Sequence, residues 1–236
     1  MRFRNPFFAL IGLLMLWTFS GCDRDPQPAS TLKKAEMQPS AVRGTIVCVG
    51  DSLTEGYGLA EEQAYPAVLK QKLLADGHPY AVINAGISGE TSSGTLSRIN
   101  WIMTLKPDIV LLETGANDGL RGTDPELTRQ NIRAIVQTLK RQNVIVILAG
   151  MEMLRNMGTA YTTAFREIYT TIAEEEHLLR IPFFLADVAG NPRLNQTDGI
   201  HPTAEGYKIV VETIYPYVLQ AIGKLERGVR PNPPLR

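Results

Sequence analysis

The chain has 236 residues, which suits one sizeable α/β domain better than two small ones. Apolar residues make up 44% of the sequence and charged residues 20%, so the composition is that of a globular protein and excludes a disordered one. The 24 basic and 24 acidic residues cancel, which gives no electrostatic reason to expect nucleic acid or a basic membrane-binding surface.

The first 21 residues have the pattern of a secretory signal peptide. Arg2 and Arg4 form a short basic head, and residues 7–19 are an almost continuous apolar run that is too short to span a bilayer comfortably. Small residues then lead to Cys22, which resembles a bacterial lipoprotein signal in which the cysteine becomes the lipidated first residue. We therefore expect a periplasmic or extracytoplasmic protein of the bacterial cell envelope, held at the membrane by a lipid on Cys22. An ordinary signal peptide and an uncleaved signal anchor are the alternatives.

The rest of the chain divides into three parts. Residues 22–43 are rich in Pro, Gln, Ser and Lys, so we expect a flexible tether. Residues 44–222 carry the regular apolar patterns and form the predicted domain. Residues 223–236 end in a proline-rich run that fits neither helix nor strand, and they form the predicted disordered tail.

Apolar runs of strand length alternate along the domain with segments of helical period. Strands are expected at residues 45–49, 80–84, 108–114, 144–149 and, from a weaker pattern, 182–185. Helices are expected at residues 65–76, from Pro125 after a capping Asp124, at 159–177 and at 203–222, with a kink or break at Pro216. Because the strand runs are β-branched and nearly continuous, this order predicts an α/β fold with a five-stranded parallel sheet covered by helices on both faces.

Four polar, glycine-containing turns lie where such a sheet forms its sites, after the carboxyl ends of strands. Gly50-Asp51-Ser52 follows the first strand, and residues 84–91 follow the second. Residues 115–118 follow the third strand, and residues 198–202 precede the last helix. Chance would scatter such turns over both ends of the sheet, so their grouping predicts a functional site at one edge.

The sequence blocks GDSLTEG, SGETS, GAND and DGIHP resemble, in order and spacing, the four blocks of the SGNH (GDSL) hydrolases. The stretch 84–120 is similar to that of the bacterial periplasmic multifunctional esterases with arylesterase, thioesterase and lysophospholipase activity. The resemblance covers about residues 45–220 and implies the SGNH hydrolase fold, a three-layer α/β/α flavodoxin-like sandwich. It also implies that Ser52 is the nucleophile, His201 its base, and Asp198 the residue that orients the histidine.

The same resemblance implies an oxyanion hole with three donors, namely the backbone N–H groups of Ser52 and Gly89 and the side-chain amide of Asn117. Read alone, each residue has a structural alternative. Ser52 could be a helix N-cap, Gly89 a simple turn residue, and Asn117 part of an Asx-turn with Asp118. Asp51 and Asp118 are expected to be structural, bonding to local backbone.

Few other residues are candidates for chemistry. His78 and His177 are expected at the surface, and Cys48 is expected to be a small buried hydrophobe. In isolation, Asp198 and His201 could also be a helix cap beside a surface histidine. No His, Cys or Asp cluster has the spacing of metal ligands, so we expect no metal and no cofactor.

The resemblance implies a serine esterase that hydrolyses carboxylic esters or thioesters through an acyl-Ser52 intermediate. The expected substrates are small molecules with short acyl or aryl groups, or lysophospholipids, and the oligomeric state is left open. An O-deacetylase of envelope polysaccharide and a non-catalytic envelope binding lipoprotein are the alternatives. Residues 151–159 are the candidate mobile substrate loop. Candidates for an acyl or aryl pocket are the apolar residues near the blocks: Leu53, Tyr57, Leu59, Ile87, Leu120, Met151, Met153, Leu154 and Met157.

Overall fold

The computed structural model describes residues 42–229. This range contains the whole of the predicted domain and the first residues of the predicted tail. The predicted signal peptide, Cys22 and most of the predicted tether lie outside the described residues.

Five parallel strands form one sheet in the order β2-β1-β3-β4-β5. Their bounds are β1 Thr45–Gly50, β2 Ala81–Gly86, β3 Ile109–Leu112, β4 Ile145–Ala149 and β5 Leu179–Ile181. Almost every residue of β1, β3 and β4 is buried, because helices cover both faces of these strands. The predicted five-stranded parallel sheet is therefore confirmed.

The position predicted for the fifth strand is wrong, because β5 precedes Pro182 instead of following it. Pro182 has no N–H to donate to a neighbouring strand, and the pairing with β4 ends at Ile181. The apolar run that suggested a strand is a loop, and its residues Phe184 and Leu185 are buried against the core. Hydrophobicity there reflects burial and not strand structure.

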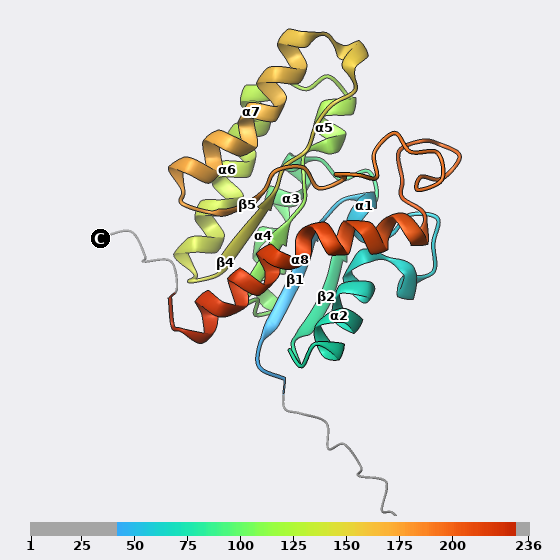
Figure 1. Cartoon of the computed structure of the whole chain (residues 1–236). Helices are drawn as coiled ribbons and strands as arrows, with labels where there is room; N and C mark the ends of the chain where they lie inside the picture. Colours follow the sequence, from blue (N-terminus) through green and yellow to red (C-terminus); the bar gives the residue numbers. More distant parts are fainter. Residues whose placement is uncertain (1–41, 230–236) are drawn as a thin grey trace, which may run out of the picture. The chain divides into compact units, whose positions relative to one another are not determined.

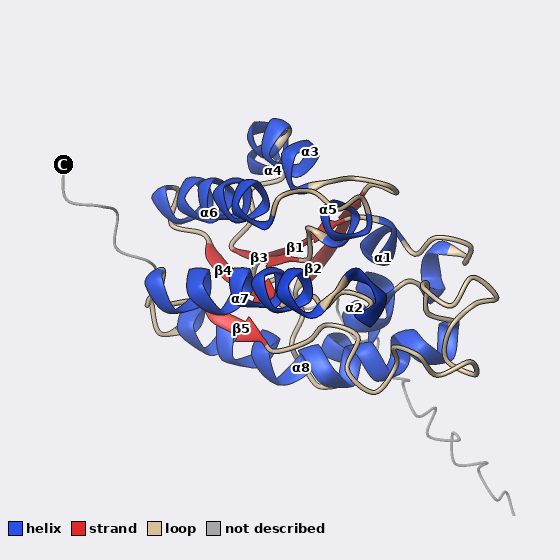
Figure 2. Cartoon of the chain, turned by 90° about the horizontal axis from the view of Figure 1, so that it is seen from above, coloured by secondary structure: helices blue, strands red, loops and turns tan. Residues whose placement is uncertain are grey.

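The helices form two layers around the sheet. The bounds of the helices are α1 Ser52–Glu55, α2 Tyr65–Ala75, α3 Ser92–Ser97, α4 Ile99–Thr104, α5 Ala116–Leu120, α6 Pro125–Arg141, α7 Thr159–Glu175 and α8 Ala204–Glu226, with 3-10 turns at Glu61–Gln63 and Arg155–Met157. Helices α2 and α8 pack together on one face, whereas α3, α4 and α6 lie on the other with α7 beside α6 (Figures 1 and 2). This is the predicted α/β/α sandwich.

Helix α8 is longer than predicted, since it extends to Glu226, four residues into the predicted tail. Of the kink or break predicted at Pro216, the break is absent, because the helix continues through the proline. A proline inside a helix removes one hydrogen bond, but α8 buries Ile214 and Tyr215 before the proline and Val218 after it. Both halves of the helix are thus held on the core. The short helices α3, α4 and α5 were not predicted, because five or six residues are too few to show a helical period.

The connections after β1 and β3 run in opposite directions across the sheet. The chain passes from β1 through α2 to β2 at one edge, and from β3 through α6 to β4 on the other side. This reversal opens a crevice at the carboxyl ends of β1 and β3, which is where open α/β sheets bind ligands. The turns that follow these two strands therefore lie at the mouth of the crevice.

Candidate active site

Ser52 is the first residue of α1 and is joined to the end of β1 through Asp51. Asp51 is the N-cap of this helix, since its Oδ1 accepts a hydrogen bond from the N–H of Leu53 at 2.9 Å. The alternative in which Ser52 is the cap is therefore wrong, and the Ser52 hydroxyl is left for another partner. Gly50 makes the turn possible, because a Cβ at this position would lie 2.1 Å from Thr54 Oγ1.

The partner of the Ser52 hydroxyl is His201, 149 residues later in the chain. Ser52 Oγ lies 2.8 Å from His201 Nε2, and His201 Nδ1 lies 2.7 Å from Asp198 Oδ2. Both are hydrogen-bond distances, and the carboxylate on Nδ1 fixes the tautomer in which Nε2 accepts a proton. The three side chains form a continuous path from an acid through a base to a hydroxyl.

The Asp198 carboxylate is held in its ionised form. Its Oδ1 accepts hydrogen bonds from the backbone N–H groups of His201 at 3.0 Å and Ile200 at 2.9 Å. These two bonds, together with the one from the His201 ring, lower the pKa of Asp198 to about 2. Asp198 is therefore negatively charged throughout the neutral range and can stabilise a positive charge on His201.

The two backbone donors of the predicted oxyanion hole are free. Within residues 42–229, neither the N–H of Ser52 nor that of Gly89 donates a hydrogen bond to another residue. The Asn117 amide is instead already bonded, since its Nδ2 donates to Asp51 Oδ2 and to the Glu90 carbonyl oxygen, each at 3.0 Å. An amide nitrogen has only two hydrogens. To serve as an oxyanion donor, Asn117 would therefore have to share or release one of these bonds.

Two arginines hold the loop that carries Gly89, and sequence reasoning missed both. Arg98 donates to both carboxylate oxygens of Glu90 at 2.6 Å and to the Ala85 carbonyl oxygen at 2.7 Å. Arg121 donates to the Gly89 carbonyl oxygen at 2.9 Å. A short, mostly buried bidentate pair fixes a loop more firmly than an exposed ion pair. Only the place of Glu90 inside the SGETS block could have indicated this role.

Comparison with known proteins shows the family to which the chain belongs. Residues 48–209 match the GDSL-like lipase/acylhydrolase family. The chain is a member of that family. It is 37% identical over 177 residues to esterase TesA of Pseudomonas aeruginosa, with 75% of this chain and 88% of that protein covered. It is 36% identical over 174 residues to thioesterase 1/protease 1/lysophospholipase L1 of Escherichia coli, with 73% and 82% covered.

Solved structures of relatives agree with this assignment. A crystal structure of TesA has a TM-score of 0.73 at 36% identity and covers 75% of this chain and 99% of its own. The psychrotrophic esterase EstA from Pseudoalteromonas, inhibited by monoethylphosphonate, has a TM-score of 0.72 at 33% identity, with 76% and 99% covered. This GDSL hydrolase is thus a carboxylic ester hydrolase with the SGNH fold, which confirms the predicted fold and enzyme class.

The two aspartates beside the site of the hydrolase are structural, but they bond differently. Asp51 bonds to the local backbone, as expected. Asp118 instead accepts hydrogen bonds from the N–H of Ser92 at 2.7 Å and from its hydroxyl at 2.6 Å, so the expectation of local bonding is wrong there. Asp118 thereby ties α5 to α3. The alternative of an Asx-turn at Asn117 is also wrong, because Asn117 lies within α5.

The other residues singled out from the sequence lie away from the triad. His78 precedes β2 and His177 precedes β5, so both belong to the amino-terminal end of the sheet, opposite the crevice. Cys48 is fully buried in β1, and burial raises the pKa of its thiol to about 12, as fits a small hydrophobe. In the part of the chain that the structure describes, no three His, Cys, Asp or Glu side chains are grouped as a metal site requires.

An apolar cavity of about 170 Å³ adjoins the triad on the side of β3, β4 and β5. Leu53, Ala116 and Ile200 line it, and each is the sequence neighbour of a predicted site residue. Five of the apolar residues proposed from the sequence also line it: Leu53, Leu120, Met151, Met153 and Leu154. The walls formed by Phe183, Leu185 and Ile200 were missed, the first two because their loop was mistaken for a strand.

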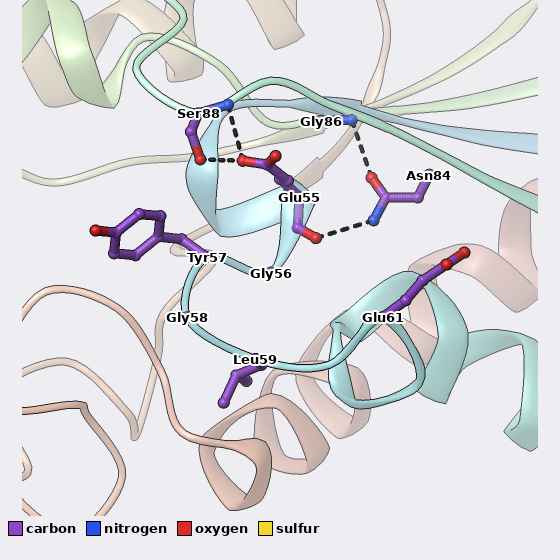
Figure 3. Close-up of a pocket in the computed structure, with 9 residues that line it drawn as sticks. All are labelled: Glu55, Gly56, Tyr57, Gly58, Leu59, Glu61, Asn84, Gly86 and Ser88. Carbon is purple, nitrogen blue, oxygen red and sulfur yellow. Dashed lines mark hydrogen bonds between the residues drawn. The ribbon is translucent and has the colours of Figure 1, made fainter.

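A second, open depression of about 610 Å³ lies on the other side, over β2 (Figure 3). Its polar walls are the side chains of Glu55, Glu61, Asn84 and Ser88. Tyr57 also lines it, and the Tyr57 ring centroid lies 4.7 Å from that of His201. The Glu55 carboxylate accepts hydrogen bonds from the N–H of Ser88, at 3.0 Å, and from its hydroxyl. Because β1 lies between β2 and β3, the two cavities flank Ser52 on opposite sides.

Proposed function

We propose that this hydrolase cleaves carboxylic esters or thioesters through an acyl-Ser52 intermediate. The observation that carries the proposal is the hydrogen-bonded path from Asp198 through His201 to Ser52 Oγ. As Ser52 Oγ attacks the carbonyl carbon, its proton passes to His201 Nε2, which then gives it to the departing alcohol or thiol. A water molecule, deprotonated by His201, releases the acid in the second half of the reaction.

The negative charge on the attacked oxygen would be stabilised by the N–H groups of Ser52 and Gly89 and by the Asn117 amide. The two free N–H groups support this role, since they need not break a bond within the protein before they donate. Donors that are fixed before the reaction stabilise the transition state without having to reorient. The arginines around Gly89 supply that fixation.

The order of the strands supports a division of the substrate into two sides. The acyl group would occupy the apolar cavity over β3, β4 and β5, and the alcohol or thiol would leave through the open depression over β2. An apolar cavity of about 150 Å³ is enough to hold benzene. The cavity of about 170 Å³ here thus suits an acyl chain of roughly six carbons.

We expect kcat/KM for p-nitrophenyl esters to rise by about fourfold per methylene from C2 to about C6, because each buried methylene contributes ~0.8 kcal/mol, and then to level off by C12. The Ala189→Trp variant, which fills the cavity, should move the optimum to shorter chains. The matched Ala75→Trp variant, at the exposed end of α2 away from the crevice, should leave the profile unchanged. A maximum at C2 followed by a steady fall would contradict the acyl assignment and favour an O-deacetylase.

We also propose that the enzyme works in the cell envelope, attached to a membrane through a lipid on Cys22. The basic head, the short apolar run and the small residues before Cys22 support this location. None of the helices in residues 42–229 is long and apolar enough to cross a bilayer. In the membrane fraction of cells, we expect detergent, but not salt, to release the protein. The Cys22→Ser variant should appear in the soluble fraction, and release of the wild type by salt would contradict the anchor.

A further inference from the structure

Glu113 is a completely buried carboxyl group beneath the nucleophile turn, and the mechanism above gives it no role. It follows β3, and its Oε2 accepts hydrogen bonds from the N–H of Asp51 at 3.3 Å and from Thr54 Oγ1 at 2.9 Å. A Cβ on Gly50 would lie 2.4 Å from this oxygen. The glycine of the GDSLTEG block is therefore required partly because Glu113 occupies the space beneath it.

The other oxygen of Glu113 shows which form the side chain takes. Glu113 Oε1 is buried and receives no hydrogen bond from an N–H or O–H donor of residues 42–229. A buried carboxylate oxygen without a donor is unfavourable, and a proton on the carboxyl group removes its negative charge. Burial, and then the charge of Asp51, raise the pKa of Glu113 well above its ordinary value, so the proton belongs on Glu113.

Among residues 42–229, no cation pairs with Glu113 and favours a second negative charge beside Asp51. The titratable groups that face it from the packed elements are Asp51 of the turn, Tyr65 of α2, Tyr169 of α7 and Tyr207 of α8. Burial raises the pKa of all three phenols, which are therefore neutral. Arg98 reaches the Gly50 carbonyl oxygen at 3.5 Å, but Glu90 already pairs with it. The charge of His201 lowers the pKa of Asp51, so His201 influences Glu113 only indirectly.

Asp51 connects Glu113 to the oxyanion hole. Asp51 Oδ2 accepts the hydrogen bond of Asn117 Nδ2 at 3.0 Å, and Asp51 Oδ1 accepts that of the Leu53 N–H. Both oxygens thus face donors, as a carboxylate requires. A proton on Asp51 would oppose one of these bonds, whereas a proton on Glu113 leaves both in place.

We propose that Glu113, as a neutral acid, is a positioning residue of the oxyanion hole. Glu113 holds Asp51, and Asp51 in turn holds the Asn117 amide and the start of α1. The role rests on the proposed serine esterase function. Glu113 touches no reacting atom. It holds the nucleophile turn by accepting hydrogen bonds from the Asp51 N–H and from the Thr54 hydroxyl. Ionisation of Glu113 would place a second buried charge beside Asp51 and disturb the donors.

The Glu113→Gln and Glu113→Ala variants separate this role from that of a charged residue. Glutamine can reproduce the neutral acid, since it carries no charge and its side-chain oxygen can accept the bonds of the Asp51 N–H and the Thr54 hydroxyl. We expect Glu113→Gln to keep kcat within a few-fold of the wild type. Any loss of activity that the wild type shows at alkaline pH because Glu113 ionises should be absent from this variant. Glu113→Ala should lower kcat by at least tenfold at unchanged KM for p-nitrophenyl butyrate. Equal damage by Gln and Ala would overturn the proposal.

A double-mutant cycle tests whether Glu113 acts through Asn117. Asn117→Ala removes an oxyanion donor and should lower kcat by about 100–1,000-fold. If Glu113 acts through Asn117, Glu113→Ala should lower kcat only slightly further in the Asn117→Ala background. Fully additive losses of kcat would show that Glu113 does not act through Asn117. Asp118→Asn is the matched amide control. Asp118 accepts two bonds from Ser92, so an amide there should lower the melting temperature, unlike Glu113→Gln.

A stability measurement tests the proton independently of activity. The unfolded chain releases the Glu113 proton near pH 4.3, whereas the folded protein keeps it, so wild-type stability falls as the pH rises above that value. Glutamine has no such proton. The melting temperature of Glu113→Gln minus that of the wild type should therefore increase from pH 5 to pH 8. A constant difference would refute the neutral acid. Absence of turnover in the folded wild type would instead refute the esterase proposal. The difference in melting temperature would still show whether Glu113 keeps its proton.

Discussion

Replacing Ser52 by alanine is expected to lower kcat for p-nitrophenyl butyrate by on the order of 10⁶-fold, as loss of the nucleophile does in other serine hydrolases. Alanine removes the oxygen that lies 2.8 Å from His201 Nε2, so no acyl-enzyme can form. Asp51, and not Ser52, caps α1, so the fold should survive the change. Steady-state kinetics together with thermal unfolding would measure both effects.

The matched control is Ser97→Ala, which removes an exposed hydroxyl at the end of α3 that bonds only to the Gly94 carbonyl oxygen. It should keep wild-type kcat. A serine-directed phosphonate should add one adduct mass to the wild type and to Ser97→Ala, and none to Ser52→Ala. Turnover by Ser52→Ala within a hundredfold of the wild type would rule out Ser52 as the nucleophile.

Replacing Asp198 by asparagine should lower kcat by about 10⁴-fold at pH 7 with little change in KM. The Asp198 carboxylate is ionised at this pH because its pKa is lowered to about 2. An amide lacks the charge that stabilises protonated His201, and its N–H can turn the ring to the tautomer whose Nε2 cannot accept a proton. The pH–rate profile should show this loss across the neutral range. Since Asp198 stays charged until the pH falls towards 2, an acidic limb above pH 4 must come from another group.

Asp187→Asn is the control for this substitution. Asp187 is exposed and has a φ of 62°, a left-handed conformation that asparagine also tolerates. We expect its kinetics to match those of the wild type. A loss of less than tenfold in Asp198→Asn would show that Asp198 does not orient the catalytic histidine.

The sequence patterns predict most of the sheet because burial on both faces leaves a continuous apolar run in a parallel strand. They fail at residues 182–185, where Phe184 and Leu185 are equally apolar but belong to a buried loop. Periodicity cannot separate these cases, and Pro182 was the one local sign against a strand. Helix α8 shows the converse, since the long-range burial of its faces outweighs the local signal of Pro216.

The residues that we propose for the chemistry could be named from four short blocks, because each block is contiguous in sequence. Their supports could not. Glu113 and Arg98 approach the site from β3 and from the junction of α3 and α4, and their hydrogen bonds join residues up to 62 positions apart. Glu113 also lies in an apolar run, and the pattern of that run indicates only a strand. Only the folded chain shows that Glu113 lies beneath the nucleophile turn and that Arg98 holds the loop with Glu90.

The place of β1 between β2 and β3 has a consequence for how enzymes of this architecture can diversify. The proposed acyl cavity takes most of its walls from segments after β3, β4 and β5, whereas the opposite depression is built from segments after β1 and β2. Apart from α1, which lines both, a change in one set of segments would leave the other set in place. If the two cavities hold the acid and the alcohol or thiol as proposed, preference for each would be a separate trait, which mutation or loop exchange could tune one at a time.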